Sequence, residues 1–565
     1  MQVNVRPLVI RGARLIDGNG GQPIDRTTVV IENHRISRVA VGPVDFPTEA
    51  RILDAEGKTI MPGLIDNHVH YRDLCGELFL AHGVTSVRDL GNPIDWILAQ
   101  RDAVAMGKVA GPRIFCAGGG FYGTPTAGHH MVATSPYEAR KITRRLIAMG
   151  VDYAKTHLGV PLDIIRAVAG EAHEVGFRVT GHLDSSIVPY IEAGIDGVEH
   201  ASGCAEATIR SEAGRKGLAA IKLWLAKFLG PWTLAERKYF PEVTECLARK
   251  GTFIEPTMVL WGASQGRRKK WEWEDYELLK DPGLSYLAEN ARLLWLNHYY
   301  TAYGARAKAV SAQDVVFGNR YSIYGILPEA QMREGCQREG EFVCQLVKAG
   351  GNVVTGTDAP AVIPGLSLHR EMEFLVEAGL SPMQAIMAAT KVGARYLGKE
   401  DELGTVEEGK LADIVVVNGD PLRDLREAQK IETVIKNGEI IDTAYHPGFF
   451  NPIPRFDCQE FYGYPVPQLR AVSPNIAVEK DAGIDVKLQG TDFFPASSVR
   501  FGGTRIPSRF TSQRELVARI PAHLLRVGTI PIYVVNPRPH VFPDRGATSN
   551  ALGFTVMFAK SNGSA

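Results

Sequence analysis

The central part of the chain, from Met61 to about Gly398, alternates short apolar strands with segments of helical periodicity. Early examples are the apolar run Gly83–Arg88, the helical period from Trp96 to Met106 and the apolar run Arg113–Cys116. Regular strand–helix alternation predicts a parallel sheet, and about eight such units predict a closed (β/α)₈ TIM barrel. An open doubly wound sheet is the alternative, but no glycine-rich dinucleotide fingerprint follows a strand. The predicted fold class is therefore α/β, with the barrel at residues 61–398.

Sequence typical of β structure lies on both sides of this central part. Residues 1–60 contain short strands separated by turns, and similar strands recur within residues 399–445. Each stretch is too small for a good β core of its own, so we expect the two to pair into one small composite β domain. Residues 446–467, rich in Pro and aromatic side chains, are predicted to be a linker. From 468 to about 560 the helical period is absent, and alternating apolar residues predict a small β-sandwich.

The stretch between His200 and Asp358 is far longer than two βα units need. The excess, at about 205–345, is mostly helical in pattern, and we predict an inserted cap over the mouth of the barrel. Longer outer helices are the alternative. The charged run Arg267–Asp275 predicts a solvated helix face. The excess is rich in aromatic residues, namely Trp224, Trp232, Trp261, Trp271, Trp273, Trp295, Tyr299 and Tyr300.

Composition excludes several classes of partner. Lys plus Arg and Asp plus Glu number 63 each, so nothing favours nucleic acid or an anionic membrane. The seven cysteines are scattered and form no CxxC pair, which argues against a disulfide framework and a cysteine-based zinc site. No apolar run reaches 18 residues. We therefore expect a cytoplasmic protein that acts on a small molecule, with no nucleic-acid or membrane partner; a homo-oligomer is left open.

Two histidines, His68 and His70, end the first predicted strand of the barrel. Alternate residues of a strand share a face, so the two imidazoles point the same way. With a distant carboxylate, Asp358 at the end of the eighth strand, they are typical of a divalent-metal site. Catalytic groups of such barrels gather at the C-terminal ends of the strands. Further strand ends supply Lys155, His182 and His200.

Lys155 is the exception in this set. A protonated lysine beside divalent cations is electrostatically unfavourable. It makes sense as a group remote from the metals, or as an amine that has reacted with carbon dioxide to give an anionic carbamate bridging two metals. The residues alone leave both alternatives open.

Four segments together closely resemble the amidohydrolase superfamily, over about residues 5–442. They are Met61–His70, Gly83–Asp89, Gly356–Asp358 and Leu403–Asp413. The resemblance is closest to the branch with imidazolonepropionase-like proteins, Xaa-Pro dipeptidases and aryl-amide hydrolases. Near the C-terminus, segments from Thr511 to Val556 resemble an IPT/TIG immunoglobulin-like module, which implies a part without chemistry of its own.

The resemblance implies two divalent metal ions, with Zn²⁺ foremost and Mn²⁺, Co²⁺ or Fe²⁺ as alternatives. The residues that it implies as ligands are His68, His70 and Asp358 for one metal, His182 and His200 for the second, and carboxylated Lys155 as the bridge. It also implies Asp358 as the catalytic residue, which takes the proton of a metal-bridging hydroxide and delivers it to the leaving nitrogen. The loop 117–130 resembles the family's glycine-rich substrate loop, which implies Tyr122 and His129 as substrate contacts.

The implied function is hydrolysis of the C–N amide bond of a peptide-like molecule or an N-acyl amino acid. A cyclic amide, aryl amide, carbamate or urea is the second candidate substrate. An inactive scaffold with an immunoglobulin-like interaction tail is the non-enzymatic alternative, and the completeness of the ligand set argues against it. Arg88 and Asp89 are expected to form an ion pair or to support the metal ligands. His157 and His173 are expected to lie outside the site.

Overall fold

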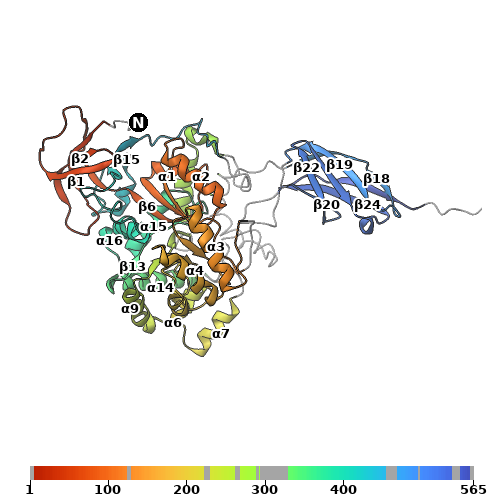
Figure 1. Cartoon of the computed structure of the whole chain (residues 1–565), viewed down its shortest axis with the longest axis horizontal. Coiled ribbons are helices and arrows are strands. Elements are labelled where there is room, and N and C mark those ends of the chain that lie inside the picture. Colours follow the sequence, from red (N-terminus) through yellow and green to blue (C-terminus); the bar gives the residue numbers. More distant parts are fainter. Residues whose placement is uncertain are drawn as a thin grey trace, which may run out of the picture. The chain divides into compact units, whose positions relative to one another are not determined.

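The computed structural model (Figure 1) describes residues 6–123, 129–221, 229–260, 268–287, 292, 295, 329–453, 467–493, 497–536 and 547–559. The described residues fall into two compact units, of which the first reaches Ile453 and the second contains the residues from 467 onward. Among the predicted aromatic residues of the cap, Trp224, Trp261, Tyr299 and Tyr300 lie outside the described residues.

The centre of the first unit consists of parallel strands that alternate with helices. One sheet contains β6 (Leu64–Val69), β7 (Val84–Asp89) and β8 (Arg113–Cys116). A second sheet contains β9 (Ala154–Thr156), β10 (Val179–Gly181), β11 (Gly197–Glu199), β12 (Phe253–Glu255) and β13 (Asn352–Val353). Isolated parallel bridges from Phe121 to Thr156 and from Val69 to Ala359 link the ends of the two sheets. This alternation confirms the predicted mixed α/β architecture.

Helices follow the strands, and their ends obey local sequence signals. The elements are α1 (Gly76–Ala81), α2 (Ile94–Ala105), α3 (Pro136–Met149), α4 (Leu162–Glu174), α5 (Val188–Glu192), α9 (Phe240–Lys250), α14 (Glu329–Lys348), α15 (Leu366–Glu377), α16 (Pro382–Ala388) and α17 (Lys391–Tyr396). Ser135 caps α3 by accepting a hydrogen bond from the Glu138 amide, and Pro136 occupies the first turn. The same helix ends at Gly150, which takes a left-handed φ of 93°.

Strands from both ends of the first unit share one sheet, in the order β16-β15-β14-β5-β1-β2-β3, with β4 beside β1. The N-terminal members are β1 (Leu8–Leu15), β2 (Ile24–Glu32), β3 (Arg35–Val41), β4 (Arg51–Asp54) and β5 (Thr59–Pro62). The later members are β14 (Ile414–Val417), β15 (Ile431–Lys436) and β16 (Glu439–Ile441). Antiparallel pairing of β5 with β14 joins the two sets, and side chains such as Ile10, Ile31 and Ile414 form their common core. Figure 1 shows β1, β2 and β15 together.

The second unit contains two β-sheets. One has the order β17-β19-β23-β22, with bounds Gln468–Ser473, Ile484–Thr491, Glu515–Ile520 and Ser508–Ser512. The other has the order β18-β26-β24-β20-β21, with bounds Ile476–Val478, Leu552–Met557, Gly528–Asn536, Ser498–Phe501 and Thr504–Ile506, and β25 (Ala547–Thr548) beside β24. Alternate residues of both sheets, among them Val486, Leu516, Ile532 and Phe554, form one hydrophobic core. The immunoglobulin-like topology of this unit stays a prediction.

The predicted cap region contains α6 (Cys204–Thr208), α7 (Glu212–Ala220), α9, α10 (Arg268–Leu279) and α14. Three of its described tryptophans, Trp232, Trp271 and Trp295, are buried core residues. Trp232 packs against Phe342 with ring centroids 5.3 Å apart, and Trp271 packs against Phe374 at 5.6 Å. We found no helix among the described residues that is long and apolar enough to cross a membrane.

The prediction of a solvated helix face at Arg267–Asp275 is wrong for two of its residues. Trp271 is 2% exposed and Asp275 is 1% exposed. The reason is Arg370 of α15, whose guanidinium lies 2.7 Å from an Asp275 oxygen and 4.8 Å from the Trp271 ring centroid. One charged residue of α10, Asp275, therefore forms a buried ion pair, whereas others, such as Lys270, face solvent.

Candidate metal centre

Two groups of potential metal ligands share His68. In one group, the ligand atoms of His68, His182 and His200 all lie within 4.8 Å of one another, and in the other those of His68, His70 and Asp358 do. Asp358 Oδ1 lies 3.2 Å from His70 Nε2 and 3.4 Å from His68 Nε2. The ends of β6, β10 and β11 and the segment after β13 thus bring these five side chains together.

The charge states of the buried histidines suit metal binding. Burial lowers the pKa of His68 and His182 well below the ordinary value, and it lowers the pKa of His200 to about 4. These imidazoles are therefore neutral near pH 7, and each offers a lone pair to a cation. Imidazole and carboxylate ligands together suit Zn²⁺ and related divalent metals.

The contact between His68 and Glu255 bears on whether His68 can bind a cation. His68 Nδ1 lies 2.7 Å from Glu255 Oε2, and both side chains are fully buried. If Nδ1 donates a proton to this carboxylate, Nε2 carries the lone pair. That Nε2 atom is buried, makes no hydrogen bond to the described residues, and faces Asp358 Oδ1 at 3.4 Å. A lone pair facing a carboxylate oxygen is repulsive unless a proton or a metal cation lies between them, so these residues could hold a metal ion.

No sequence motif singles out Glu255 as a site residue, although Glu255 is the last residue of a recognisable strand. The pair that it forms with His68 requires glycine at position 356, because a Cβ there would lie 2.6 Å from Glu255 Cδ and 2.6 Å from His68 Cβ. Asp66 gives a second link between the strand ends, since its Oδ2 accepts from Thr357 Oγ1 at 2.6 Å and its Oδ1 from the His68 amide at 3.2 Å. Gly356 and Thr357 therefore help to position His68, a candidate metal ligand.

Lys155 meets an anionic partner that sequence reasoning missed. Its Nζ lies 2.6 Å from Glu199 Oε2, and both side chains are buried. Burial lowers the pKa of Lys155, although Glu199 opposes that shift. Burial alone would raise the pKa of Glu199, but Lys155 and Arg88 together hold it below the ordinary value. The sequence feature that could have indicated Glu199 as a site residue is its position directly before His200.

An ion pair and support of the metal ligands were the two alternatives expected for Arg88 and Asp89, and the two side chains contact different partners beside the site. Arg88 Nη2 lies 3.4 Å from Glu199 Oε1, and its guanidinium lies 4.0 Å from the Tyr396 ring centroid. Asp89 Oδ2 accepts from the Tyr71 amide at 2.7 Å, just after His70. Arg88 therefore stabilises the buried Glu199, and Asp89 holds the backbone directly after His70.

The backbone at the strand ends is unusual for residues other than glycine. His200, Thr257 and Asp358 have positive φ angles of 56°, 52° and 58°. Such left-handed conformations cost about 1–2 kcal/mol per residue and collect at functional sites. His200 Nδ1 also bonds with Thr257 Oγ1, so two of the three positions support each other.

The loop after β8 places aromatic rings beside the histidines. Tyr122 stacks on His157, with ring centroids 4.3 Å apart, and His157 meets His182 edge-on at 4.4 Å. The expectation that His157 lies outside the site is therefore wrong. The sequence feature that could have indicated His157 is its position two residues after Lys155, because residues i and i+2 of a strand share a face. His173, on α4, instead pairs with Asp196, with 2.9 Å between its Nε2 and Asp196 Oδ2.

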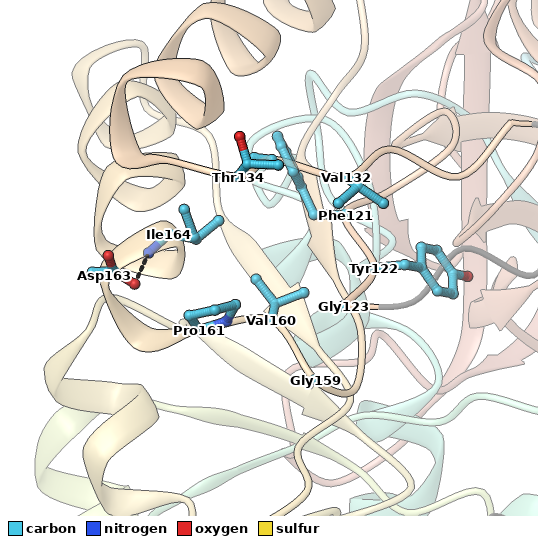
Figure 2. Close-up of a pocket in the computed structure, with 11 residues that line it drawn as sticks. Phe121, Tyr122, Gly123, Val132, Thr134, Gly159, Val160, Pro161, Asp163 and Ile164 are labelled. Carbon is cyan, nitrogen blue, oxygen red and sulfur yellow. Dashed lines mark hydrogen bonds between the residues drawn. The ribbon is translucent and has the colours of Figure 1, made fainter.

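His129 and Tyr122 lie on the predicted substrate loop. The carbonyl oxygen of His129 approaches Gly119 so closely that a Cβ there would lie only 1.8 Å away, and the His129 ring meets that of His130 at 4.6 Å. Residues of this loop, among them Phe121, line a pocket of about 230 Å³ together with Val132 and with Ile164 of α4. Figure 2 shows the Tyr122 ring pointing away from this pocket.

Comparison with known proteins places the chain in a family. The profile of the amidohydrolase family matches residues 59–441, more than half of the sequence. The chain belongs to this family. The matched range contains the five candidate ligand side chains, Lys155 and Glu255, and it excludes the C-terminal unit.

Individual relatives of this amidohydrolase are distant. Imidazolonepropionase of Geobacillus kaustophilus is 25% identical over 480 residues, which cover 77% of this chain and 98% of the relative. A solved Xaa-Pro dipeptidase with bound methionine shares the fold with a TM-score of 0.54 at 22% identity, over 77% of this chain and 100% of the other. Aspergillus niger ochratoxinase gives a TM-score of 0.54 at 19% identity, over 79% and 100%. These two structures support the fold alone.

Proposed function

We propose that this chain is a metal-dependent hydrolase that cleaves the C–N amide bond of a peptide-like small molecule or an N-acyl amino acid. The observation that carries the proposal is the pair of candidate ligand groups that share His68, with Asp358 Oδ1 close both to His68 in β6 and to His70 directly after this strand. Membership of the amidohydrolase family supports hydrolysis of a carbon–nitrogen bond. A dipeptidase and an ochratoxinase among the structural relatives agree with an amide substrate.

The proposed ligands are His68, His70 and Asp358 for one metal ion, and His182 and His200 for a second. Divalent metal ions held there supply a polarised carbonyl and a water molecule of lowered pKa. The neutral imidazoles contribute no net charge, so Asp358 is the anionic member of this set. We expect Zn²⁺, although the same donors accept Mn²⁺, Co²⁺ or Fe²⁺.

We propose a carbamate on Lys155 as the bridge between the two positions. In this reaction the neutral amine forms a bond to carbon dioxide and releases one proton to solvent, and burial favours the neutral amine by lowering the pKa of Lys155. The ion pair with Glu199 must open for this reaction. Glu199 then keeps Arg88 and the Thr180 hydroxyl as partners.

Asp358 is the proposed proton carrier. Its side chain is 24% exposed, whereas His68 is fully buried, so a substrate can reach the carboxylate. A carboxylate in this position can accept a proton from the attacking water and deliver it to the leaving nitrogen. Tyr122 and His129 are the proposed substrate contacts on the neighbouring loop.

The test is a combination of metal analysis and a substrate panel. The purified protein is first analysed for bound metal by mass spectrometry, and it is then assayed with dipeptides, N-acyl amino acids and aryl amides. We expect about two metal ions per chain and hydrolysis of at least one N-acyl amino acid or dipeptide. Hydrolysis confined to aryl or cyclic amides, carbamates or ureas would move the substrate class to the second candidate. A metal-free protein that hydrolyses none of them would contradict the proposal and favour a scaffold.

The C-terminal unit contributes none of the proposed ligands. We propose that it is an IPT/TIG-like immunoglobulin module that serves assembly or partner binding. Its two sheets with one common core support this proposal.

A further inference from the structure

The ring of Tyr122 lies between two imidazoles. It is nearly parallel to the ring of His130, with centroids 3.5 Å apart and an interplanar angle of 4°. It is also stacked on the ring of His157, at 4.3 Å and 15°. Two rings stacked so closely on one face would overlap each other, so His130 and His157 cover opposite faces of Tyr122. We call this arrangement the Tyr122 sandwich.

The hydroxyl end of the sandwiched ring borders the metal ligands. A Cβ on Gly91 would lie 3.8 Å from Tyr122 Oη and 3.4 Å from His70 Nδ1 and Cε1, so the hydroxyl and the His70 ring border the same small space. On the other side, His157 meets His182 edge-on at 4.4 Å. Burial and the negative charge of Asp358 raise the pKa of Tyr122, so its phenol keeps its proton at neutral pH.

The covered faces restrict what Tyr122 can do. A tyrosine with an open face can act as a platform for an aromatic group of the substrate. Tyr122 has both faces occupied, so only its edge and its hydroxyl remain for a ligand. A fixed hydrogen-bond donor beside developing negative charge contributes far more to catalysis than a mobile one.

We propose that Tyr122 donates a hydrogen bond to the carbonyl oxygen of the substrate amide, and that His130 and His157 are positioning residues that hold its ring for this contact. The proposal rests on the proposed function for the identity of the substrate oxygen. The sandwich itself does not depend on the substrate.

The catalytic part is tested with Tyr122→Phe, which keeps the ring and removes Oη. With the best substrate of the panel, we expect kcat to fall by about 10²–10³-fold, as for other lost oxyanion donors, with little change in KM or metal content. Tyr137→Phe, at an exposed tyrosine of α3, is the matched control and should behave like the wild type. A wild-type kcat in Tyr122→Phe overturns the donor role.

The positioning part is tested with His157→Ala and His157→Phe. Phenylalanine keeps a flat ring against Tyr122, so it should restore most of the kcat that alanine loses, at unchanged metal content. Metal loss in both variants would show that His157 supports His182 instead. His130→Ala and His130→Phe repeat the comparison on the other face, should either His157 variant fail to fold.

A spectroscopic readout separates the sandwich from the proposed function. With 3-fluorotyrosine at position 122 of the metal-loaded protein, ring currents of the two imidazoles should displace the ¹⁹F resonance from that of an exposed fluorotyrosine. His157→Ala and His130→Ala should each move the resonance toward the exposed value. An unchanged resonance in both variants overturns the sandwich. If no amide of the panel is hydrolysed, the donor role falls with the proposed function, whereas the ¹⁹F result still decides the sandwich.

Discussion

Replacing Glu255 by Gln should change metal affinity and folding stability in opposite directions. Glu255 Oε2 lies 2.7 Å from His68 Nδ1, with both side chains fully buried. The carboxylate keeps the proton on Nδ1 and so leaves the Nε2 lone pair for a cation. A neutral amide holds this tautomer less strongly. Loss of such a supporting partner typically costs 10–100-fold in metal affinity, which corresponds to about 1.4–2.8 kcal/mol.

The metal-free protein should respond in the other direction. Burial raises the pKa of Glu255 well above its ordinary value, and the nearby carboxylates of Glu371, Glu199, Asp66 and Asp358 raise it further. A carboxyl whose folded-state pKa is raised destabilises the fold at every pH above its unfolded pKa. Glutamine removes this penalty at neutral pH. The variant without metal should therefore be at least as resistant to urea as the wild type without metal.

Glu371→Gln is the matched control for Glu255→Gln. Burial raises the pKa of Glu371 to about 8, and its Oε2 accepts a hydrogen bond from the Val259 amide at 2.7 Å. This variant should relieve the same kind of penalty and leave metal affinity unchanged. Competition with a chromophoric chelator measures the affinity, and urea unfolding of the metal-free proteins measures the stability. Wild-type metal affinity in Glu255→Gln, or an equal loss in both variants, would refute the reasoning.

Four further outcomes are expected. Lys155→Ala should lose most activity and bind less than the full metal complement, and Lys155→Arg should not restore either, because a guanidinium forms no stable carbamate; two metal ions and near-normal turnover in Lys155→Ala would contradict the bridge. Asp358→Asn should lower kcat by about 10²–10⁴-fold, the usual worth of a general acid–base group, and an unchanged kcat would remove it from proton transfer. A chain shortened after Ile453 should keep its metal and most turnover per folded molecule; folded, metal-loaded but inactive protein would show that the C-terminal unit completes the site. His446 Nδ1 donates a hydrogen bond to Glu77 Oε1 at 2.7 Å, and this bond and the charge of Glu77 raise the pKa of His446. That stabilisation is complete below the unfolded pKa and is lost as the pH rises through the raised folded value, so His446→Gln should lower Tm more at pH 5.5 than at pH 8.5, and equal losses would contradict the link.

Local sequence determined the strand–helix alternation and much of the candidate site. A period of two in a strand places His68 and His70 on one face wherever that strand lies, so the ligand pair could be predicted without a structure. The positions of His182, His200 and Asp358 at strand ends followed from the same reasoning combined with the parallel architecture. Helix ends such as Ser135 and Gly150 depend on neighbouring residues only, and are equally visible in the sequence.

Only the tertiary structure decided which distant side chains meet. The pairs Lys155–Glu199 and His68–Glu255 join groups from different strands, and no local pattern states that a glutamate will turn inward beside a lysine or an imidazole. The burial of Asp275 required a partner, Arg370, from a helix nearly one hundred residues later, so a charged helical run looked solvated. Burial of a charge depends on its partner, because an unpaired charge in the interior costs far more than folding can supply. Sequence period shows the face on which a residue lies, but the identity of what covers that face is a property of the folded chain.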